Sequence, residues 1–529
     1  MNIERVGARE SLQIGNERIT VPEWIDHLKD RDDIVEMDYG YTGRFMSCKC
    51  KTKDGLHFVF RDCDENTLTA NVNFNFFMDT DHRLAKTGFT HFFEHMMFKR
   101  VKLKGKYLKS DTFNKKAADN GIILNAFTGT EGIVINSALF PKELIRRKAK
   151  YIDEAAAYRR LLGQSTKSKK PFDDVQLFFD MVYGISYDHK MLEEDVANEK
   201  NIVKSEIAMN KNDNWALYRG SRKVIEGSDF YDFLGRAEDI DDITVQDCID
   251  FSNILIDGCT DSATRHVLTG NFRDIPEVID MWIDTMSKVI KLKDAMMTYE
   301  DFDRHKSSTF RKLGNVKVKV DGLEKRKGKH LIVSVPDSKS SELDIYAEVD
   351  FADKKWSKYN LMRSRSIISV LCNFMVGNMA SPLYKIFREE LGWTYRVSSV
   401  VRPIGIDSDK YLIGWDMVLG DHVPVDMSTL DKAKDILSNL VIDEKLVKFI
   451  LTVRTDKLLA SMDKMVYNAL DMPYADNIKM SEWNEFMAPL HDVKLEEWQY
   501  LWKTIVDSMY YVLLHGCEKD SQAEDNINA

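Results

Sequence analysis

The sequence predicts an α+β protein whose two halves have a similar order of strands and helices. Strand patterns, in which apolar and polar residues alternate, lie at 57–62 and 69–79, and strand patterns resume at 330–336 and 343–351. A charged and irregular stretch at 293–328 separates the halves and is expected to be a linker. The shared order suggests a diverged internal duplication, although no residue-level repeat is evident.

The remaining elements follow from helical periodicity and from helix and strand boundary signals. In the first half we expect helices at 87–100, 141–162, 198–214 and 275–290, and strands at 132–141 and 266–272. In the second half we expect strands within 395–418, a helix at 495–509 and an edge strand at 510–516. The predicted divisions are an N-terminal extension of unknown role (1–44), a first domain (45–292), the linker (293–328) and a second domain (329–529).

Composition excludes several classes of protein. The chain has 529 residues, of which 44% are hydrophobic and 30% are charged, so it can bury a large core. Its net charge of −10 argues against charge-driven nucleic-acid binding. No apolar run reaches the length of about 18 residues that a membrane span needs, and residues 1–20 lack the apolar segment of a secretory signal. We therefore expect no nucleic-acid or membrane partner.

Seven dispersed cysteines without an export signal indicate reduced thiols, and so a cytoplasmic location, which for a viral chain would be the host cytoplasm. Cys48, Cys50 and Cys63 form an incomplete metal-site pattern, and a strand with two thiols on one face is the preferred interpretation. Two basic stretches, at 101–110 and 163–174, are expected to be solvated loops, with a substrate or partner contact as the alternative.

The clearest chemical signal is the motif His91-Phe92-Phe93-Glu94-His95. On a helix, positions i and i+4 share a face, so His91 and His95 can both direct a ring nitrogen at one metal ion. Glu94 projects to the same side, where a carboxylate can take a proton from an activated water. The order H-x-x-E-H is that of inverzincin peptidases. The alternative is a pair of surface or core histidines without a metal.

A catalytic zinc site needs a third protein ligand, and an acid on another element is the candidate. Glu199 and Glu206 are seven residues apart, or two helical turns, so both face the same way. One of them can bind the metal while the other orients a ligand or the substrate. Three acids that precede them, Glu193, Glu194 and Asp195, are expected to be helix-start charges that face water.

These residues resemble the active-site region of the M16 metallopeptidases, the group of pitrilysin, insulin-degrading enzyme and mitochondrial processing peptidase. The similar segments are GFTHFFEHMMFK (88–99), NAFT (125–128) and NEKNIVKSEIAMNKNDN (198–214). The resemblance implies one zinc ion per chain, held by His91, His95 and Glu206, with Glu199 supporting the site. It makes Glu94 the general base. It also places Asn125 and Ala126 in a segment that binds the substrate backbone.

The resemblance continues in the second half, where SPLYKIFREELGWTYRVSS (381–399) is similar to the C-terminal signature of the family. It implies that Arg388 and Tyr395 contact the substrate and stabilise the tetrahedral intermediate, because both donate hydrogen bonds to an oxygen on which charge develops. Three features depart from the family. The interval from His95 to Glu206 is unusually long, at 111 residues (206 − 95), Arg100 replaces the usual glycine, and residues 1–45 have no counterpart.

The family resemblance implies two α/β domains of similar topology with mixed, mainly antiparallel sheets packed with helices, which together form half of a closed shell. It implies a zinc-dependent endopeptidase that acts on peptides or unfolded segments. The simplest partner for the half shell is a second copy of the chain. By resemblance, Arg388 and Tyr395 of one subunit would complete the zinc site of the other. The alternatives are a non-catalytic structural or assembly subunit with the same fold, and a binding protein with an incidental zinc.

Overall fold

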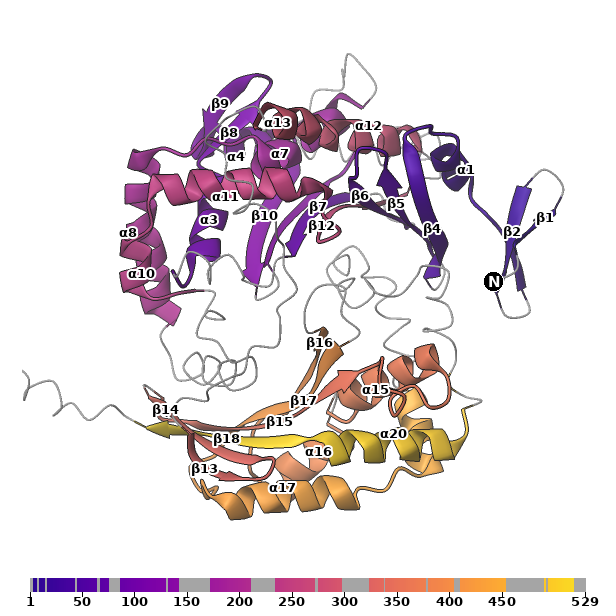
Figure 1. The fold of residues 1–529 in the computed structure, drawn as a ribbon, viewed down its shortest axis with the longest axis vertical. Helices are drawn as coiled ribbons and strands as arrows, with labels where there is room; N and C mark the ends of the chain where they lie inside the picture. Colours follow the sequence, from indigo (N-terminus) through magenta and orange to yellow (C-terminus); the bar gives the residue numbers. More distant parts are fainter. Residues whose placement is uncertain are drawn as a thin grey trace, which may run out of the picture. The chain divides into compact units, whose positions relative to one another are not determined.

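In a computed structural model the chain folds into two compact units (Figure 1). One boundary between the two units falls after Lys204, within helix α8 (Glu193–Asn210). The helix is continuous across this boundary, so Glu199 and Glu206 belong to one helix. The structure describes residues 3–6, 9–14, 17–42, 45–63, 67–75, 86–129, 132–141, 172–210, 234–271, 275–296, 323–336, 338–376, 379–403, 410–452, 490 and 493–517.

The first unit is built on a seven-stranded mixed sheet with the order β10-β11-β7-β12-β6-β5-β4. Only the pairing of β12 with β6 is parallel among these described strands, and the other neighbours are antiparallel. The strands are β4 (Ile34–Thr42), β5 (Phe45–Thr52), β6 (His57–Asp62), β7 (Leu68–Asn75), β10 (Ile122–Gly129), β11 (Gly132–Leu139) and β12 (Thr264–Gly270).

Alternation along β7 shows why this sheet forms at the centre of the unit. Leu68, Ala70, Val72 and Phe74 are fully buried on one face, where helices pack. The helices of the unit are α1 (Glu23–Lys29), α3 (Phe89–Met97), α4 (Ser110–Asp119), α7 (Asp173–Tyr187), α8, α10 (Ala237–Asp241), α11 (Val245–Asp257), α12 (Glu277–Met286) and α13 (Lys288–Met296). Among them, α3 and α7 contact β11, and α3 also contacts β10.

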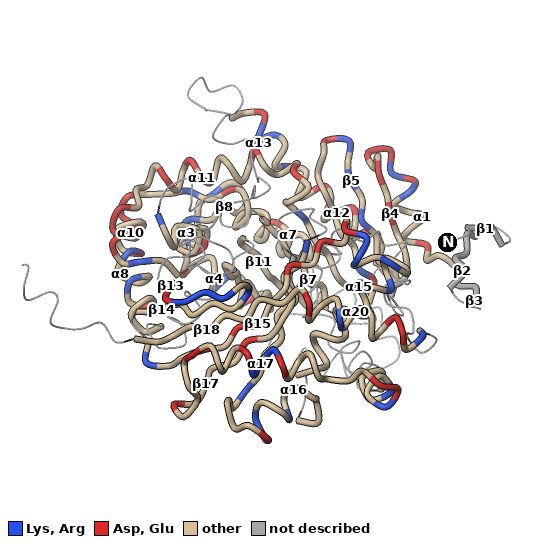
Figure 2. Tube along the Cα trace, turned by 60° about the horizontal axis from the view of Figure 1, so that its bottom comes forward, with Lys and Arg blue, Asp and Glu red and all other residues tan. Residues whose placement is uncertain are grey.

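The second unit has a six-stranded mixed sheet with the order β13-β14-β18-β15-β17-β16. Its one parallel pair among the described strands is β14 with β18. The strands are β13 (Leu323–Lys327), β14 (His330–Pro336), β15 (Ser341–Asp350), β16 (Ser398–Pro403), β17 (Lys410–Leu419) and β18 (Tyr510–Cys517). All five residues of the edge strand β13 are exposed, and its basic residues are blue in Figure 2; such an edge discourages pairing with a foreign strand.

Both sheets have the same topology. In each unit the last strand in the chain, β12 or β18, lies inside the sheet, parallel to one neighbour and antiparallel to the other. The strand orders correspond one to one when β5, β6, β7, β11 and β10 are matched to β13, β14, β15, β17 and β16, and β4 is an addition to the first sheet. The similar order seen in the sequence is therefore a repeated topology, and the α+β prediction with mainly antiparallel sheets is confirmed.

Helices pack on the core face of the second sheet. They are α15 (Leu361–Phe374), α16 (Pro382–Tyr384), a π-helical turn η4 (Lys385–Glu390), α17 (Met427–Asn439) and α20 (Leu495–Ser508). Trp415 of β17 and Trp502 of α20 meet in this core with ring centroids 5.9 Å apart. Asn360 and Asp426 cap the N-termini of α15 and α17 through their side chains.

Three sequence expectations differ from the structure. The strand expected at an edge at 510–516 is β18, which lies inside the second sheet because it pairs with β14 on one side and β15 on the other. The first unit begins before residue 45, because β4 belongs to its sheet and Arg31, just after α1, donates a 2.6 Å hydrogen bond to Asp280 of α12. The basic stretch at 101–110 is a hairpin, β8 (Arg100–Leu103) and β9 (Lys106–Lys109), followed by α4. Val101 and Leu103 bury one face of β8, while Lys104 and Gly105 adopt left-handed conformations in the turn.

Further residues at the N-terminus form a small antiparallel sheet of β1 (Ile3–Val6), β2 (Arg9–Ile14) and β3 (Glu17–Thr20). Cys48 and Cys50 lie buried at alternate positions of β5, as the strand interpretation predicts. The expected helix at 142–162, the basic stretch up to residue 171 and the linker from 297 to 322 lie outside the described residues. Among the described helices, none combines the length and apolarity needed to cross a bilayer.

Candidate metal centre

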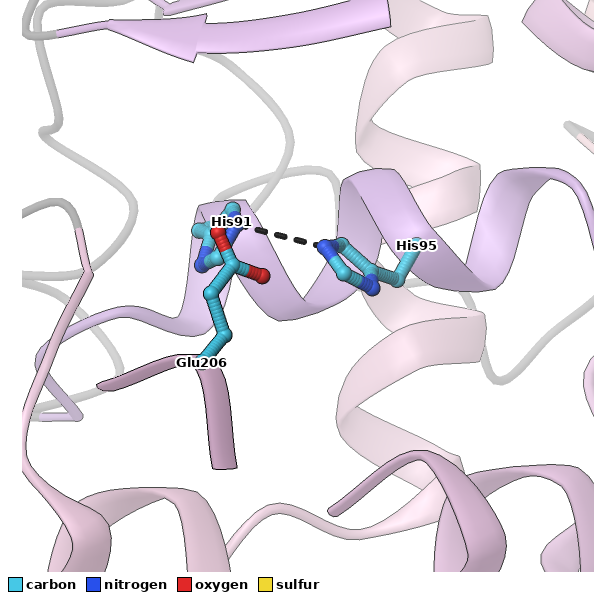
Figure 3. A group of neighbouring side chains, drawn as sticks. All are labelled: His91, His95 and Glu206. Atoms are coloured by element: carbon cyan, nitrogen blue, oxygen red, sulfur yellow. Dashed lines mark hydrogen bonds between the residues drawn. The ribbon is translucent and has the colours of Figure 1, made fainter. Parts of the chain in front are cut away.

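Helix α3 places the two histidines of the motif side by side. It begins after Gly88, whose φ of 75° lets the chain turn into the helix, and its apolar side chains Phe92, Phe93 and Met96 are fully buried. His91 is buried and His95 is half-buried, and their Nε2 atoms lie 3.2 Å apart, as the dashed line in Figure 3 shows. The predicted convergence of the two imidazoles on one face of a helix is therefore present.

Glu206 of α8 completes a group of three metal-ligating side chains. One donor atom from each of His91, His95 and Glu206 lies within 4.8 Å of the others, and no other such group occurs in the part of the chain that the structure describes. Figure 3 shows the carboxylate of Glu206 directed at the two rings. Two imidazoles and one carboxylate are a donor set that suits zinc in a catalytic site, where a fourth position stays open. The residues present thus fit a zinc ion.

The protonation of His91 favours metal binding. Burial, assisted by the nearby His95, lowers the pKa of His91 to about 4. The ring is therefore neutral at pH 7, and a nitrogen lone pair is available. A metal ligand must be deprotonated to bind, so this environment removes most of the proton competition.

Glu199 orients His95 by contacting its Nδ1 atom, on the side of the ring away from His91. Its side chain is only 3% exposed, and its Oε1 lies 2.9 Å from His95 Nδ1 while Oε2 contacts the ammonium of Lys99. Burial opposes ionisation of Glu199, but hydrogen bonds from His95 and Lys99 outweigh it and lower the pKa of the carboxyl. An ionised Glu199 accepts the Nδ1 proton, which leaves the lone pair of His95 on Nε2, the atom that faces His91.

The motif carboxylate has a defined partner on the neighbouring sheet. Thr128 of β10 donates a 2.6 Å hydrogen bond from its hydroxyl to Glu94 Oε2. The residue is buried, because Ala126 and Thr128 lie on the face of the strand that packs toward α3. The hydrogen bond restricts the rotation of the Glu94 carboxylate.

Asn125 and Ala126 lie on an edge strand, at one end of the described order of the first sheet. Side chains alternate along β10, so Asn125 is on the face opposite to Ala126 and Thr128, and it is exposed. The structure therefore brings Thr128, rather than the side chain of Asn125, to the motif helix. The sequence could have indicated this, because Ala126 and Thr128 are two residues apart in the NAFT segment and therefore lie on the same face of a strand.

In the second unit the side chains of Arg388 and Tyr395 lie close together. The guanidinium carbon of Arg388, in η4, lies 4.5 Å from the ring centroid of Tyr395 and 5.1 Å from that of Tyr384. The arginine is therefore within cation–π distance of two aromatic rings. Tyr395 is 80% exposed, so its hydroxyl is accessible. Tyr384 lies four residues before Arg388, a helical spacing that could have indicated it.

One expectation about the acids before Glu199 is wrong. Asp195 does not face water, because its side chain is 15% exposed and accepts a 2.7 Å hydrogen bond from Arg100 Nε. Glu194, at 66% exposure, contacts the same guanidinium. The sequence gives only a weak signal for these pairs, since the partners are 94 and 95 residues apart.

Comparison with solved structures identifies the fold. The chain is similar to a protease from Helicobacter pylori (TM-score 0.59, 13% identity, covering 88% of this chain and 99% of that one). It is also similar to a peptidase M16 inactive domain from Pseudomonas fluorescens (TM-score 0.57, 15% identity, 89% and 98% covered). Pitrilysin matches over about half its length (TM-score 0.52, 13% identity, 91% of this chain and 47% of that chain). The chain therefore has the fold of the M16 peptidases.

Comparisons of the sequence alone identify no relative. No model of a protein family matches it, and no curated protein matches it. The fold is consequently established by structure, while the chemistry of the site depends on the residues described above.

Proposed function

We propose that this protein is a zinc-dependent endopeptidase that hydrolyses peptides or unfolded protein segments inside a closed chamber. The observation that carries the proposal is the convergence of His91, His95 and Glu206 within 4.8 Å. Glu94 lies on the same helix as both histidines and is held by Thr128. A site that served structure alone would need four closed ligands and no positioned carboxylate beside them.

The proposed mechanism assigns each side chain a separate task. Bound zinc would lower the pKa of a water molecule and polarise the peptide carbonyl. Glu94 would take a proton from the attacking water as its oxygen adds to the carbonyl carbon, and would deliver that proton to the amine when the C–N bond breaks. Glu199 holds His95 in the tautomer that ligates through Nε2. Arg388 and Tyr395 are the proposed donors to the oxygen of the tetrahedral intermediate, and a second copy of the chain would bring them to the zinc site.

A non-catalytic subunit with the same fold is the second candidate. One of the similar solved structures is described as an inactive M16 domain, so this fold does not by itself imply catalysis. The two candidates differ in what Glu94 does. An enzyme needs its carboxylate, whereas a non-catalytic subunit would not depend on it.

The test compares Glu94→Gln with the unmodified protein and with His91→Ala. A mixed peptide library is incubated with each protein, with and without a chelator, and the zinc content of each is measured by atomic emission. We expect about one zinc per chain in the unmodified protein and in Glu94→Gln, and cleavage only in the unmodified protein without chelator. Glu193→Gln is the matched control, because this exposed residue is also a glutamate on one of the two ligand-bearing helices.

Peptide cleavage by Glu94→Gln would contradict its role as base. A zinc-bearing unmodified protein that cleaves no peptide would favour the non-catalytic subunit.

A further inference from the structure

Three acidic residues share one face of α8. They contact the motif helix and the residues that follow it, a segment that runs antiparallel to α8. Asp195, Glu199 and Glu206 are spaced by four and seven residues, which places them in one row along the helix. Arg100 contacts Asp195, Lys99 and His95 contact Glu199, and the two histidines approach Glu206. Residues 195 to 206 of α8 thus contact residues 100 down to 91 in turn, so the two segments run antiparallel.

The Arg100 end of this row is a well-ordered ion pair. Arg100 Nε donates to Asp195 Oδ2 at 2.7 Å, and its NH2 group donates to Asp195 Oδ1 at 3.2 Å, so the guanidinium binds both carboxylate oxygens. The same NH2 group donates to Glu194 at 2.5 Å. Side chains of Arg100 and Asp195 are 16% and 15% exposed, so water screens this pair less than an ordinary surface pair.

Backbone contacts fix the same junction. The amide of Lys190 donates to the carbonyl of Arg100, and the amide of Lys102 donates to the carbonyl of Asp188, both at 2.8 Å. The hairpin β8–β9 is thereby joined to the segment that leads into α8. Helix α8 is consequently anchored at its N-terminal end, three turns before Glu206, by the residue that directly follows Lys99.

Charge along the row also favours a metal at one end. Lys99 and Arg100 supply two positive charges beside Glu199 and Asp195, and Glu206 is the acid of the row that contributes to the metal-ligating group. Glu199 and Asp195 are therefore neutralised by protein cations, whereas Glu206 lies with His91 and His95 in the metal-ligating group. The row thus assigns one acid to the metal and two to holding the helix.

We propose that Arg100 is a positioning residue for the metal centre, which acts through Asp195 by fixing the position of α8 and hence of Glu206. The inference rests on the proposed function, because it takes His91, His95 and Glu206 as zinc ligands. Removal of the Arg100 side chain leaves Asp195 without its bidentate partner and loosens the N-terminal end of α8, although the backbone hydrogen bonds of the preceding segment remain. Since the metal site needs Glu206 to approach both histidines, small movements of α8 weaken it.

The experiment measures zinc affinity, by competition with a chromogenic chelator, together with thermal unfolding of the zinc-free proteins. We expect Arg100→Ala and Asp195→Ala each to weaken zinc binding by about tenfold to a hundredfold, as loss of residues that support metal ligands does. The double variant should lose no more than either single one, because both changes remove the same contact. Arg100→Lys should recover part of the affinity.

Lys102→Ala is the matched control. It removes a 3.0 Å ion pair of the same hairpin, but its partner Asp188 precedes α8 rather than lying on it. We expect this variant to bind zinc as the unmodified protein does. In peptide cleavage, Arg100→Ala should lower kcat at saturating zinc with little change in KM.

The outcomes separate this inference from the proposed function. Failure of the unmodified protein to bind zinc would overturn the proposed function. Normal binding by the unmodified protein and equal zinc affinity in Arg100→Ala, with only a lower melting temperature, would overturn the positioning role and leave the proposed function intact.

Discussion

The hydroxyl of Thr128 donates a 2.6 Å hydrogen bond to the carboxylate of Glu94, which joins the edge strand of the first sheet to the motif helix. The bond restrains the group proposed as the general base. It also means that the segment expected to bind the substrate backbone and the base belong to one rigid arrangement.

Replacing Thr128 with valine tests this arrangement, because valine has the same shape but no hydroxyl. We expect kcat for peptide cleavage to fall by about tenfold, since general-base catalysis depends on a correctly oriented carboxylate. Zinc content should not change. Thr128→Ser keeps the hydroxyl and should retain most of the activity. Equal kcat values for the valine variant and the unmodified protein would show that Glu94 needs no such restraint.

Gly88 and Gly235 are packed backbone against backbone at the start of the motif helix. A Cβ on Gly88 would lie 2.6 Å from Gly235 Cα, and both residues have left-handed φ angles of 75° and 82°. We expect Gly88→Ala to lower the free energy of unfolding by more than the about 1–3 kcal/mol typical of backbone strain alone. Gly105→Ala is the control, because Gly105 also has a left-handed φ, of 79°, but nothing lies within 4 Å of its Cβ position. Denaturant titration measures both, and equal losses would exclude the backbone clash.

Two buried histidines should make stability depend on pH. Burial lowers the pKa of His189 and of His266 to about 4, from an unfolded value of 6.5. The unfolded chain therefore binds more protons between these values, so the free energy of unfolding rises with pH from 4 to 6.5. Each histidine contributes about 3 kcal/mol of the difference at pH 4, from the linkage relation.

His266→Gln removes one of these groups and should flatten the dependence by that amount. Tyr187 Oη lies 2.8 Å from His266 Nε2, and His266 Nδ1 lies 3.0 Å from the carbonyl of His57, so the neutral ring is fully hydrogen-bonded. Urea unfolding at several pH values, with chelator present, gives the slope. The exposed His422→Gln is the control for replacing a histidine with glutamine. An unaltered slope in His266→Gln would indicate that His266 does not titrate in this range.

Mixing two inactive chains tests whether the second unit acts across a dimer. Arg388→Ala and His91→Ala should each be nearly inactive alone, since one lacks a donor to the substrate and the other lacks a metal ligand. If subunits exchange at random, half of the dimers are mixed and each has one intact site, so activity should return to up to roughly a quarter of the unmodified value. Subunit exchange without recovered activity would place both halves of the site in one chain.

The sequence predicted that His91 and His95 converge because their spacing is local. His91, Glu94 and His95 lie within five residues of one another, and helical spacing alone puts the two histidines on one face. Glu199 and Glu206 could likewise be paired by their spacing on one helix. What the sequence did not reveal were contacts between elements, such as Arg100 with Asp195, because no periodicity links residues that are far apart in the chain.

The bounds of strands and helices were likewise predicted well only where the local pattern of apolar residues is clear. Strand β6 has the predicted bounds, because its residues alternate and are flanked by turn residues. Helix α8 begins at Glu193 rather than near 198, since its first turn is polar and carries no apolar periodicity. The sequence of the hairpin β8–β9 predicts a loop because lysines dominate it, although Val101 and Leu103 alternate and are buried.

The position of β12 and β18 inside their sheets bears on how the chain folds during translation. Between the end of β7 at Asn75 and the start of β12 at Thr264 the ribosome adds 189 residues (264 − 75), and between β15 and β18 it adds 160 (510 − 350). At about 5–20 residues per second these intervals last roughly 10–40 s, during which β6 and β7, or β14 and β15, lack the strand that lies between them. A nascent chain therefore exposes two unpaired strand edges in each unit, and we expect chaperone binding to concentrate on them until the missing strand leaves the exit tunnel.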